Sequence, residues 1–252
     1  MNKRIFLIII SCVTIVCIVV GACIHLRFAV PTFSSVRRSI SRAVEESFDS
    51  IEDADEYGEY DFLPETHNFS SPIQEFDSIV IDAKVMGITV ERANRFEISG
   101  TYAKEALKPS FSVSGGTLKI TQPVNKVKLV TNGNCKIVIT VPYGTKLDSA
   151  DINVDVGAVA LKGIDVEDAQ INTDVGAIAI ENVEFREIRA NSDVGAVSVE
   201  LAQPISEYNI DAKSDVGAIQ VNGSNAKRKY SQTGSTNKRI KIKTDVGGID
   251  IK

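Results

Sequence analysis

The tripeptide Asp-Val-Gly occurs five times in the second half of the chain, and this repetition constrains the fold more than any other feature. The copies begin at residues 155, 174, 193, 215 and 245, so their starts lie 19, 19, 22 and 30 residues apart. A small residue and an apolar-x-apolar pair follow each copy. A period near 20 residues with insertions is typical of a solenoid, in which each repeat stacks on its neighbours. We therefore predict an all-β, single-domain β-solenoid or β-roll with rungs of about 19–22 residues.

The alternation of apolar residues slips by one position in every copy. In the second copy Thr173 and Val175 share one face of a strand, and the next apolar series begins at Ile178, three residues later instead of two. Such a slip would turn the second strand outward unless the backbone turns a corner. Glycine tolerates the dihedral angles and the close approach that a corner needs. We expect structural corners at Gly157, Gly176, Gly195, Gly217 and Gly247.

Stacked rungs align equivalent residues into ladders about 4.8 Å apart. Strand alternation predicts that the inward ladders include Ile152/Ile171/Ala190, Val154/Thr173/Ser192 and Val156/Val175/Val194. The outward ladders are expected to be Asn153/Asn172/Asn191 and Asp155/Asp174/Asp193.

The segments around the repeats also have the pattern of strands. Val85–Val90 matches the apolar end of a repeat and is expected to form a degenerate first rung. Ser114–Thr117 contains two glycines between alternating runs, which is a hairpin signal. The polar and basic insertion Asn222–Arg239 is expected to be a flexible loop on one edge of the stack. We assign the solenoid domain to residues 71–252.

The beginning of the chain has the composition of a membrane anchor. Residues 1–4 are a short tail that contains Lys3 and Arg4, and residues 5–24 carry no charge. Twenty residues in a helix span roughly 30 Å, the thickness of a hydrocarbon core. We expect a transmembrane or signal-anchor helix over residues 5–24. The alternative is a lipoprotein signal, because Val20–Cys23 resembles the bacterial lipobox with Cys23 as the lipidated residue.

Residues 25–70 are expected to be a juxtamembrane linker, basic at first and then acidic. Residues 1–44 contain six basic residues and no acid, whereas residues 45–65 contain ten acids and no base. Like charges at this density favour an extended, solvated spacer. The basic residues after the helix favour a cytoplasmic domain by the positive-inside rule. Long domains can cross a membrane despite such charges, and we expect a single-pass cell-membrane protein with an extracytoplasmic C-terminal domain.

No set of residues within the range 71–252 points to catalysis. The two histidines, His25 and His67, lie outside this range, so a Ser-His or Cys-His dyad is not expected. Cys135 lies in an apolar strand pattern and is expected to be a core residue rather than a reactive thiol. We find no phosphate loop, no zinc spacing and no basic face for nucleic acid. We expect no enzyme activity and no cofactor.

The aspartates of the repeat are the candidate site. Asp155, Asp174 and Asp193 would form a ladder of carboxylates that a calcium ion could bridge. The favoured hypothesis is local: each carboxylate accepts hydrogen bonds from backbone N–H groups of its own turn.

The strand Ile137–Val141, the turn Pro142-Tyr143-Gly144 and the repeats from Ile152 onward resemble the bacterial "putative adhesin" family of domains of unknown function. The resemblance covers roughly residues 71–252. It implies a β-helix or β-roll, often membrane-anchored, and some members accompany envelope-stress signalling genes. The family has no established catalytic residues, so the resemblance assigns none here.

These observations favour a membrane-tethered, non-catalytic β-solenoid that binds or scaffolds at the bacterial cell envelope. The expected partners are the membrane, a cell-wall polymer or an envelope protein, or a copy of the chain itself, and not nucleic acid. One alternative is an accessory of an envelope-stress sensor. Others are a carbohydrate-active β-helix enzyme, which would need carboxylates clustered in a cleft, and a cytoplasmic polymer-forming β-helix.

Overall fold

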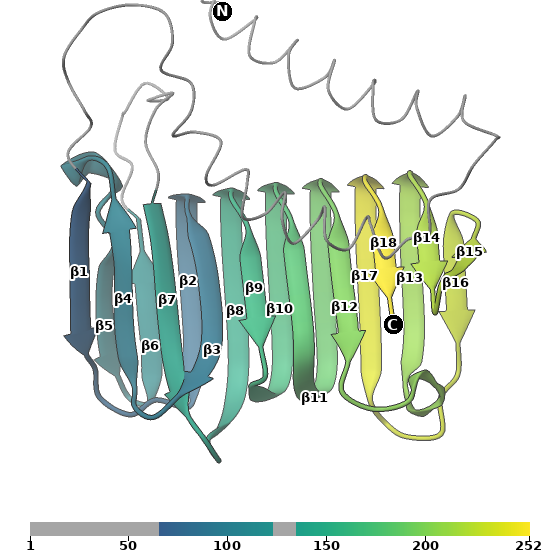
Figure 1. Ribbon diagram of the computed structural model, residues 1–252, viewed down its shortest axis with the longest axis horizontal. Helices are drawn as coiled ribbons and strands as arrows, with labels where there is room; N and C mark the ends of the chain where they lie inside the picture. The colour runs from purple at the N-terminus through teal and green to yellow at the C-terminus, as the bar shows by residue number, and fades with distance from the viewer. Residues whose placement is uncertain (1–65, 123–134) are drawn as a thin grey trace, which may run out of the picture. The chain divides into compact units, whose positions relative to one another are not determined.

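The computed structural model describes residues 66–122 and 135–252. Over these residues the chain forms 18 strands and two short 3-10 helices, η1 (Glu105–Leu107) and η2 (Ile205–Glu207), and the strands belong to one curled sheet (Figure 1). The all-β prediction is confirmed. The predicted anchor at residues 5–24, Cys23 and the linker up to residue 65 lie outside the described residues. Within the described ranges, no helix has the length and apolar character needed to cross a bilayer.

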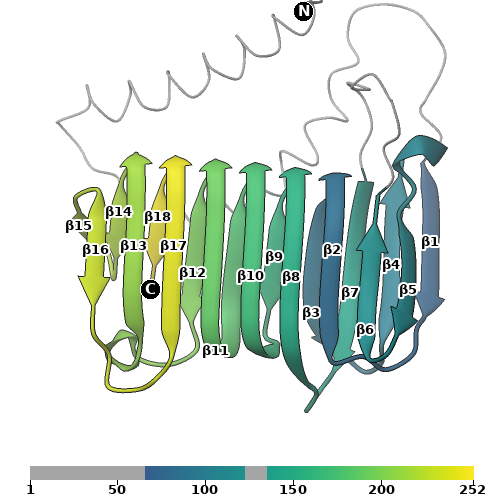
Figure 2. The same cartoon turned by 180° about the vertical axis from the view of Figure 1, so that it is seen from behind.

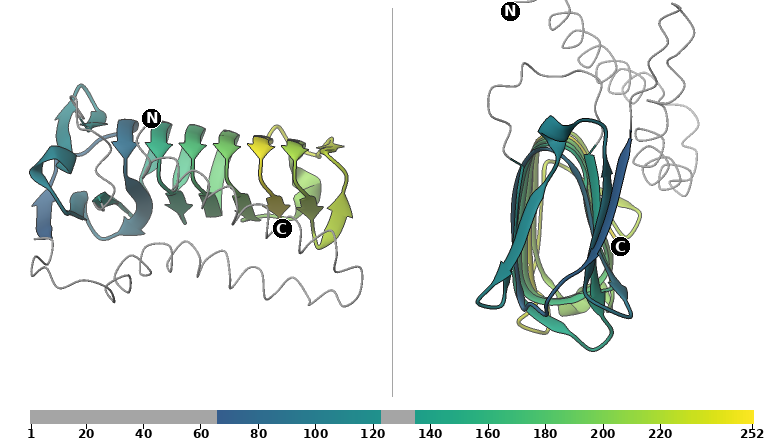
Figure 3. Two further views of the ribbon diagram at one scale, coloured as in Figure 1. Left: turned by 90° about the horizontal axis from the view of Figure 1, so that it is seen from above. Right: turned by 90° about the vertical axis from the view of Figure 1, so that its left-hand side faces the viewer.

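The sheet folds into two walls that face each other across a narrow interior (Figure 3). Wall A contains, in spatial order, β1 (His67–Pro72), β4 (Glu97–Tyr102), β7 (Cys135–Pro142), β3 (Gly87–Ala93), β9 (Val159–Lys162), the first part of β11 (Ile178–Val194), β12 (Val197–Leu201), β18 (Ile249–Ile251), β14 (Ile219–Val221) and β15 (Ser224–Ala226). Wall B contains β5 (Ser110–Ser114), β6 (Thr117–Thr121), β2 (Ser78–Val85), β8 (Lys146–Val156), β10 (Asp165–Val175), the second part of β11, β17 (Arg239–Val246), β13 (Asn209–Val216) and β16 (Lys229–Gln232) (Figure 2).

The predicted ladders form because the repeats pair in parallel and in register. Ile171 lies opposite Ile152 on β8 and Ala190 on β11, and Asn172 lies opposite Asn153 and Asn191. The degenerate first rung is also confirmed, since Val85 pairs with Val156 and Ile88 with Val159. The turn at Ser114–Thr117 joins the antiparallel strands β5 and β6.

The rungs do not follow one another in sequence order. Strand β17, from the last repeat, pairs with β11 on one side and with β13, from the fourth repeat, on the other. Its continuation β18 lies between β12 and β14 in the same way. Strand β2 is likewise inserted between β6 and β8.

The prediction of a flexible loop over Asn222–Arg239 is wrong. Part of this insertion forms β15 and β16, which pair antiparallel with β14 and β13 at the end of the stack. The physical reason is that the last rung has exposed edges whose N–H and C=O groups need partners. The two short strands supply these partners. At the other end of the stack lie η1, β1, which pairs antiparallel with β4, and β5, which pairs antiparallel with β6 (Figure 1).

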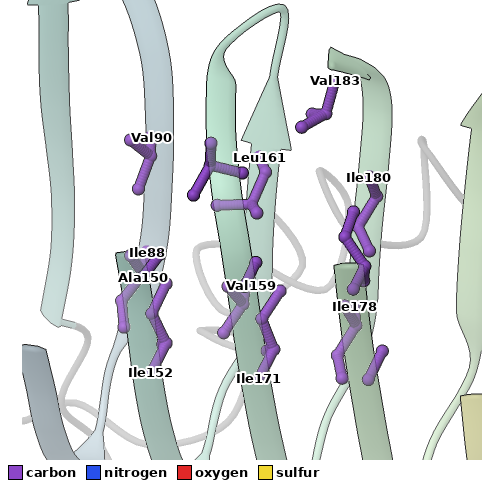
Figure 4. Packing of buried hydrophobic residues seen from close by; sticks show 14 of the residues in the cluster. Ile88, Val90, Ala150, Ile152, Val159, Leu161, Ile171, Ile178, Ile180 and Val183 are labelled. Carbon is purple, nitrogen blue, oxygen red and sulfur yellow. The ribbon is translucent and has the colours of Figure 1, made fainter. Parts of the chain in front are cut away.

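The interior is filled by aliphatic side chains from both walls, and so the domain needs no helix to cover either inner face. Ile152 and Ile171 of wall B and Val159 and Ile178 of wall A are at most 1% exposed. Figure 4 shows these side chains stacked from rung to rung. The predicted inward positions Thr173 and Ser192 are also buried.

The valines of four repeats are exposed, contrary to the prediction that Val156, Val175 and Val194 face inward, and that of the fifth, Val246, is half-buried. The side chains of Val156, Val175 and Val194 are 41%, 48% and 39% exposed, and that of Val216 is 50% exposed. The alternation slips one residue earlier than the glycine: Asp174 and Val175 are both exposed, between the buried Thr173 and Ile178. The corner therefore begins at the aspartate and places two consecutive side chains outside.

The glycines do form the predicted corners, and the reason is the spacing between rungs. Gly176 N–H donates to the carbonyl of Val194 at 2.9 Å, while a Cβ on Gly176 would overlap the carbonyl oxygen of Gly157 in the preceding rung. The same overlap recurs for Gly195 against Gly176 and for Gly247 against Gly195. A side chain here would force neighbouring rungs apart.

We predict that Gly176→Ala lowers the free energy of unfolding by at least about 2 kcal/mol, because the added methyl group would overlap the fixed backbone of Gly157 in the preceding rung. Gly248→Ala is the matched control. Gly248 occupies the position that alanine holds in the other four copies, and the nearest atom to a Cβ there is 3.7 Å away. Chemical denaturation should show little change or a small gain for the control. Equal stability of the two variants would contradict the close-approach explanation.

Candidate binding surface

Outward side chains on wall B form continuous rows across the rungs. The asparagine row is joined by hydrogen bonds: Asn191 donates through Nδ2 to Asn172 Oδ1 at 2.9 Å, and Asn172 donates to Asn153 Oδ1 at 2.7 Å. Asn153 in turn donates to Asp151 at 3.2 Å. The register continues this row through Lys243 and Lys213 to Lys229. This row is thus neutral at its centre and cationic towards β16.

The aspartates of the repeats form the next row, which we call the aspartate row: Asp155, Asp174, Asp193, Asp245 and Asp215. Its two ends are paired with lysines. Asp155 lies 3.0 Å from Lys84, Asp245 lies 2.8 Å from Lys243, and Asp215 lies 2.7 Å from Lys213. The hydrogen bond to Asp155 raises the pKa of Lys84, and the hydrogen bond from Lys213 lowers the pKa of Asp215. Over the described residues, no cation lies within ion-pair distance of Asp174 or Asp193.

The hypothesis that each aspartate holds its own turn is not supported. In the described part of the chain, no carboxylate of the aspartate row accepts a hydrogen bond from a backbone N–H. Instead, hydroxyl groups of buried serines donate hydrogen bonds to the carbonyl groups of the corner glycines. Ser192 donates through Oγ to the carbonyl of Gly176 at 3.2 Å, and Ser214 donates to that of Gly247 at 2.8 Å.

The calcium ladder proposed for Asp155, Asp174 and Asp193 does not form a chelating cluster. Across residues 66–122 and 135–252, no group of three or more His, Cys, Asp or Glu side chains is arranged to hold a metal ion. The strands space the carboxylates one per rung, and Asp155 is already occupied by Lys84. The arrangement resembles a row of separate charges more than a coordination shell.

A row of valines lies beside the aspartate row, and sequence reasoning missed it by placing those side chains in the core. We call it the valine row: Val85, Val156, Val175, Val194, Val246 and Val216. One signal could have found it. In the five Asp-Val-Gly copies the valine directly precedes the glycine of the corner, so it is the last residue of its strand, where the alternation can break.

The opposite end of the β8–β10–β11 strands carries a network of charges around a shallow pocket of about 370 Å³. Its three carboxylates are all paired: Asp165 with Arg92, Glu167 with Lys146 and Arg186, and Glu184 with Lys238. The pKa of Glu184 is lowered by hydrogen bonds from Gln203 and Lys238. These ion pairs connect successive rungs, and none of the three carboxylates that line the pocket is unpaired.

Cys135 is a core residue, as expected. Its side chain is buried in β7, and burial raises the pKa of the thiol to about 12.

Residues 76–214, more than half of the chain, match the family model described as Toastrack DUF4097. The chain belongs to the Toastrack DUF4097 family. This confirms the predicted relationship to bacterial adhesin-like domains of unknown function. The Toastrack match ends within β13, and the stack of this protein continues through β18.

Solved structures resemble this chain to different degrees. The crystal structure of a "putative cell adhesion protein" from Clostridium sporogenes is 19% identical, with a TM-score of 0.60 over 74% of this chain and 99% of its own. A "putative adhesin" from Bacteroides fragilis is 15% identical, with a TM-score of 0.36 over 75% of this chain and 98% of its own. A "putative adhesin" from Parabacteroides distasonis is 10% identical, with a TM-score of 0.36 over 74% of this chain and 97% of its own. No curated protein matches the chain.

We predict that Asp174→Asn stabilises the domain at low ionic strength, because Asp174 lies between Asp155 and Asp193 without an ion-pair partner. The melting temperature should rise by about 1–2 °C, and the gain should fade in 0.5 M salt. Asp155→Asn is the control, since it removes the ion pair with Lys84 and should give no gain. A gain from both variants, or one that persists in high salt, would rule out relief of repulsion.

We also predict that Cys135 resists alkylation at pH 8 in the folded protein, because its thiol stays protonated well above that pH. The raised pKa means that its contribution to stability is complete below the unfolded value of about 8.5 and is lost as the pH rises towards 12. Peptide mass mapping after iodoacetamide treatment should find Cys135 modified only when denaturant is present. Rapid modification without denaturant would show an accessible thiolate.

Proposed function

We propose that this protein is a membrane-tethered, non-catalytic module for binding or scaffolding at the bacterial cell envelope. The observation that carries the proposal is the surface of the stack, where functional groups recur in straight rows along the rungs instead of converging on a pocket. Rows of this kind suit contact with an extended partner. The names of the structural relatives, which include cell adhesion, agree with this role.

The tether is the uncharged run of residues 5–24, which has the length of a membrane span. We propose that it is retained as a single-pass helix and that the rungs lie outside the cytoplasm. The acidic stretch at residues 45–65 then holds the stack away from the membrane surface. A cell-wall polymer or another envelope protein is the proposed partner.

The arrangement of acids favours binding over glycan cleavage. A glycosidase needs two carboxylates flanking one bond in a cleft, with the acid of the pair kept protonated. Here the pocket carboxylates Asp165, Glu167 and Glu184 are paired with cations. The acids of the aspartate row are spaced one per rung along wall B.

Protease treatment of intact cells tests the topology. With a C-terminal epitope tag, we expect loss of the full-length band in cells whose outer layers admit the protease, while a cytoplasmic marker stays intact. Protection of the tagged domain until the cells are lysed would overturn the extracytoplasmic assignment. In parallel, Cys23→Ser should leave the protein in the membrane fraction with an unchanged migration, whereas its release would show a lipid anchor.

A further inference from the structure

The valine row is a continuous apolar ridge along one edge of the stack. Its six members come from six rungs that are adjacent in space, and it spans about 24 Å at the usual strand spacing. The edge is the one along which the arrowheads of β8, β10, β17 and β13 end in Figure 1. Val156, Val175, Val194 and Val216 are exposed, whereas Val85 and Val246 are half-buried.

The fold itself does not require valine at this position. The glycine makes the corner, hydroxyl groups of Ser192 and Ser214 tie it, and the interior is filled by other side chains. A polar residue in the turn would leave all of these contacts in place. A soluble surface normally keeps exposed apolar side chains scattered, and a contiguous row indicates an interaction site.

The two flanks of the valine row differ in charge. In the five Asp-Val-Gly copies the aspartate directly precedes its valine, so the aspartate row follows one flank of the valine row. At the end of the valine row, Val85 is preceded by Lys84 instead. Asp174 and Asp193, at the middle, are the members that no cation of the described residues pairs. On the other flank the corner continues into glycine and then alanine, as in Gly176-Ala177, and carries no charge.

We propose that the valine row and the central aspartates bind a cationic amphipathic helix of a partner protein, an inference that rests on the proposed binding function and names the chemistry of the partner. A helix rises 5.4 Å per turn and the rungs repeat at about 4.8 Å, so successive turns lie close to successive valines. Apolar residues at i, i+4 and i+7 face the ridge. Lysine or arginine on one side of that stripe then lies over Asp174 and Asp193.

Other occupants fit less well. An anionic lipid surface or an acidic partner would be repelled by the aspartate row. A second copy of the stack could cover the valines, but its own edge carries the same acids, and the lysines there, Lys84, Lys213 and Lys243, already pair with aspartates of their own row.

Photo-cross-linking tests the proposal with the full chain in a non-ionic detergent. The probe is a helical peptide of about 16 leucine and lysine residues with one benzophenone side chain on its apolar face. We expect cross-links at the Asp-Val-Gly corners when the products are mapped by mass spectrometry. The combined variant Val156→Thr, Val175→Thr and Val194→Thr keeps the shape and β-branching of each residue, and it should reduce the yield at least tenfold. Asp174→Asn with Asp193→Asn should reduce it severalfold.

The matched control is Asp148→Asn with Asp211→Asn, which removes two exposed carboxylates of wall B away from the aspartate row and should leave the yield unchanged. A scrambled peptide of the same composition and a leucine–glutamate peptide should both fail to cross-link at the corners. If the threonine variant does not fold, the aspartate variants and the mapped positions on the natural chain decide the question.

An unchanged yield in the threonine variant, or cross-links spread over both walls, would overturn the proposal. A natural chain that dimerises where the threonine variant is monomeric would assign the valine row to a second copy instead. These outcomes are separate from the topology experiment: a domain that is cleaved on intact cells but gives no corner cross-links keeps the proposed function and loses this inference.

Discussion

The structure depends on how closely the backbones approach at the corners. In four of the five copies the glycine N–H donates to a carbonyl of the adjacent rung, as from Gly176 to Val194, and the space between the rungs admits no Cβ. This contact sets the corners directly above one another. Once they are aligned, every other position of the repeat is aligned too, and the aliphatic interior, the asparagine row and the charged rows follow from one local constraint.

Much of this could be read from the sequence, because strand alternation and a fixed period determine which residues become neighbours. The Ile171 and Asn172 ladders were predictable for that reason. The valines were not, since a slip of one residue can fall on either side of Val175 and the apolar pattern is the same in both cases. The order in which the strands pair could not be predicted from the sequence either. Because the repeats resemble one another, β17 could pair beside β11 or at the far side of β13 with the same apolar pattern.

The candidate surface was only partly predictable for a related reason. Spacing alone places the aspartates in a row, but their partners come from elsewhere in space. Lys84 reaches Asp155 because the first rung is inserted next to β8, and Lys243 reaches this region because β17 enters the middle of the stack. Asp174 and Asp193 stay without an ion pair because the nearby lysines, Lys84 and Lys243, pair with Asp155 and Asp245 instead. Which residues are available for a partner thus depends on the order of the rungs as well as on the motif.

The out-of-order rung also affects how the domain can assemble and vary. Strands β13 to β16 leave the ribosome before β17 and β18, yet they have no place on the growing stack until those later strands fill the gap beside β11 and β12. Vectorial addition of one repeat after another therefore stops at β12, and the remaining rungs must dock together. For the same reason, this half of the stack cannot be lengthened by duplicating a single repeat, because a new copy would separate two segments that have to meet.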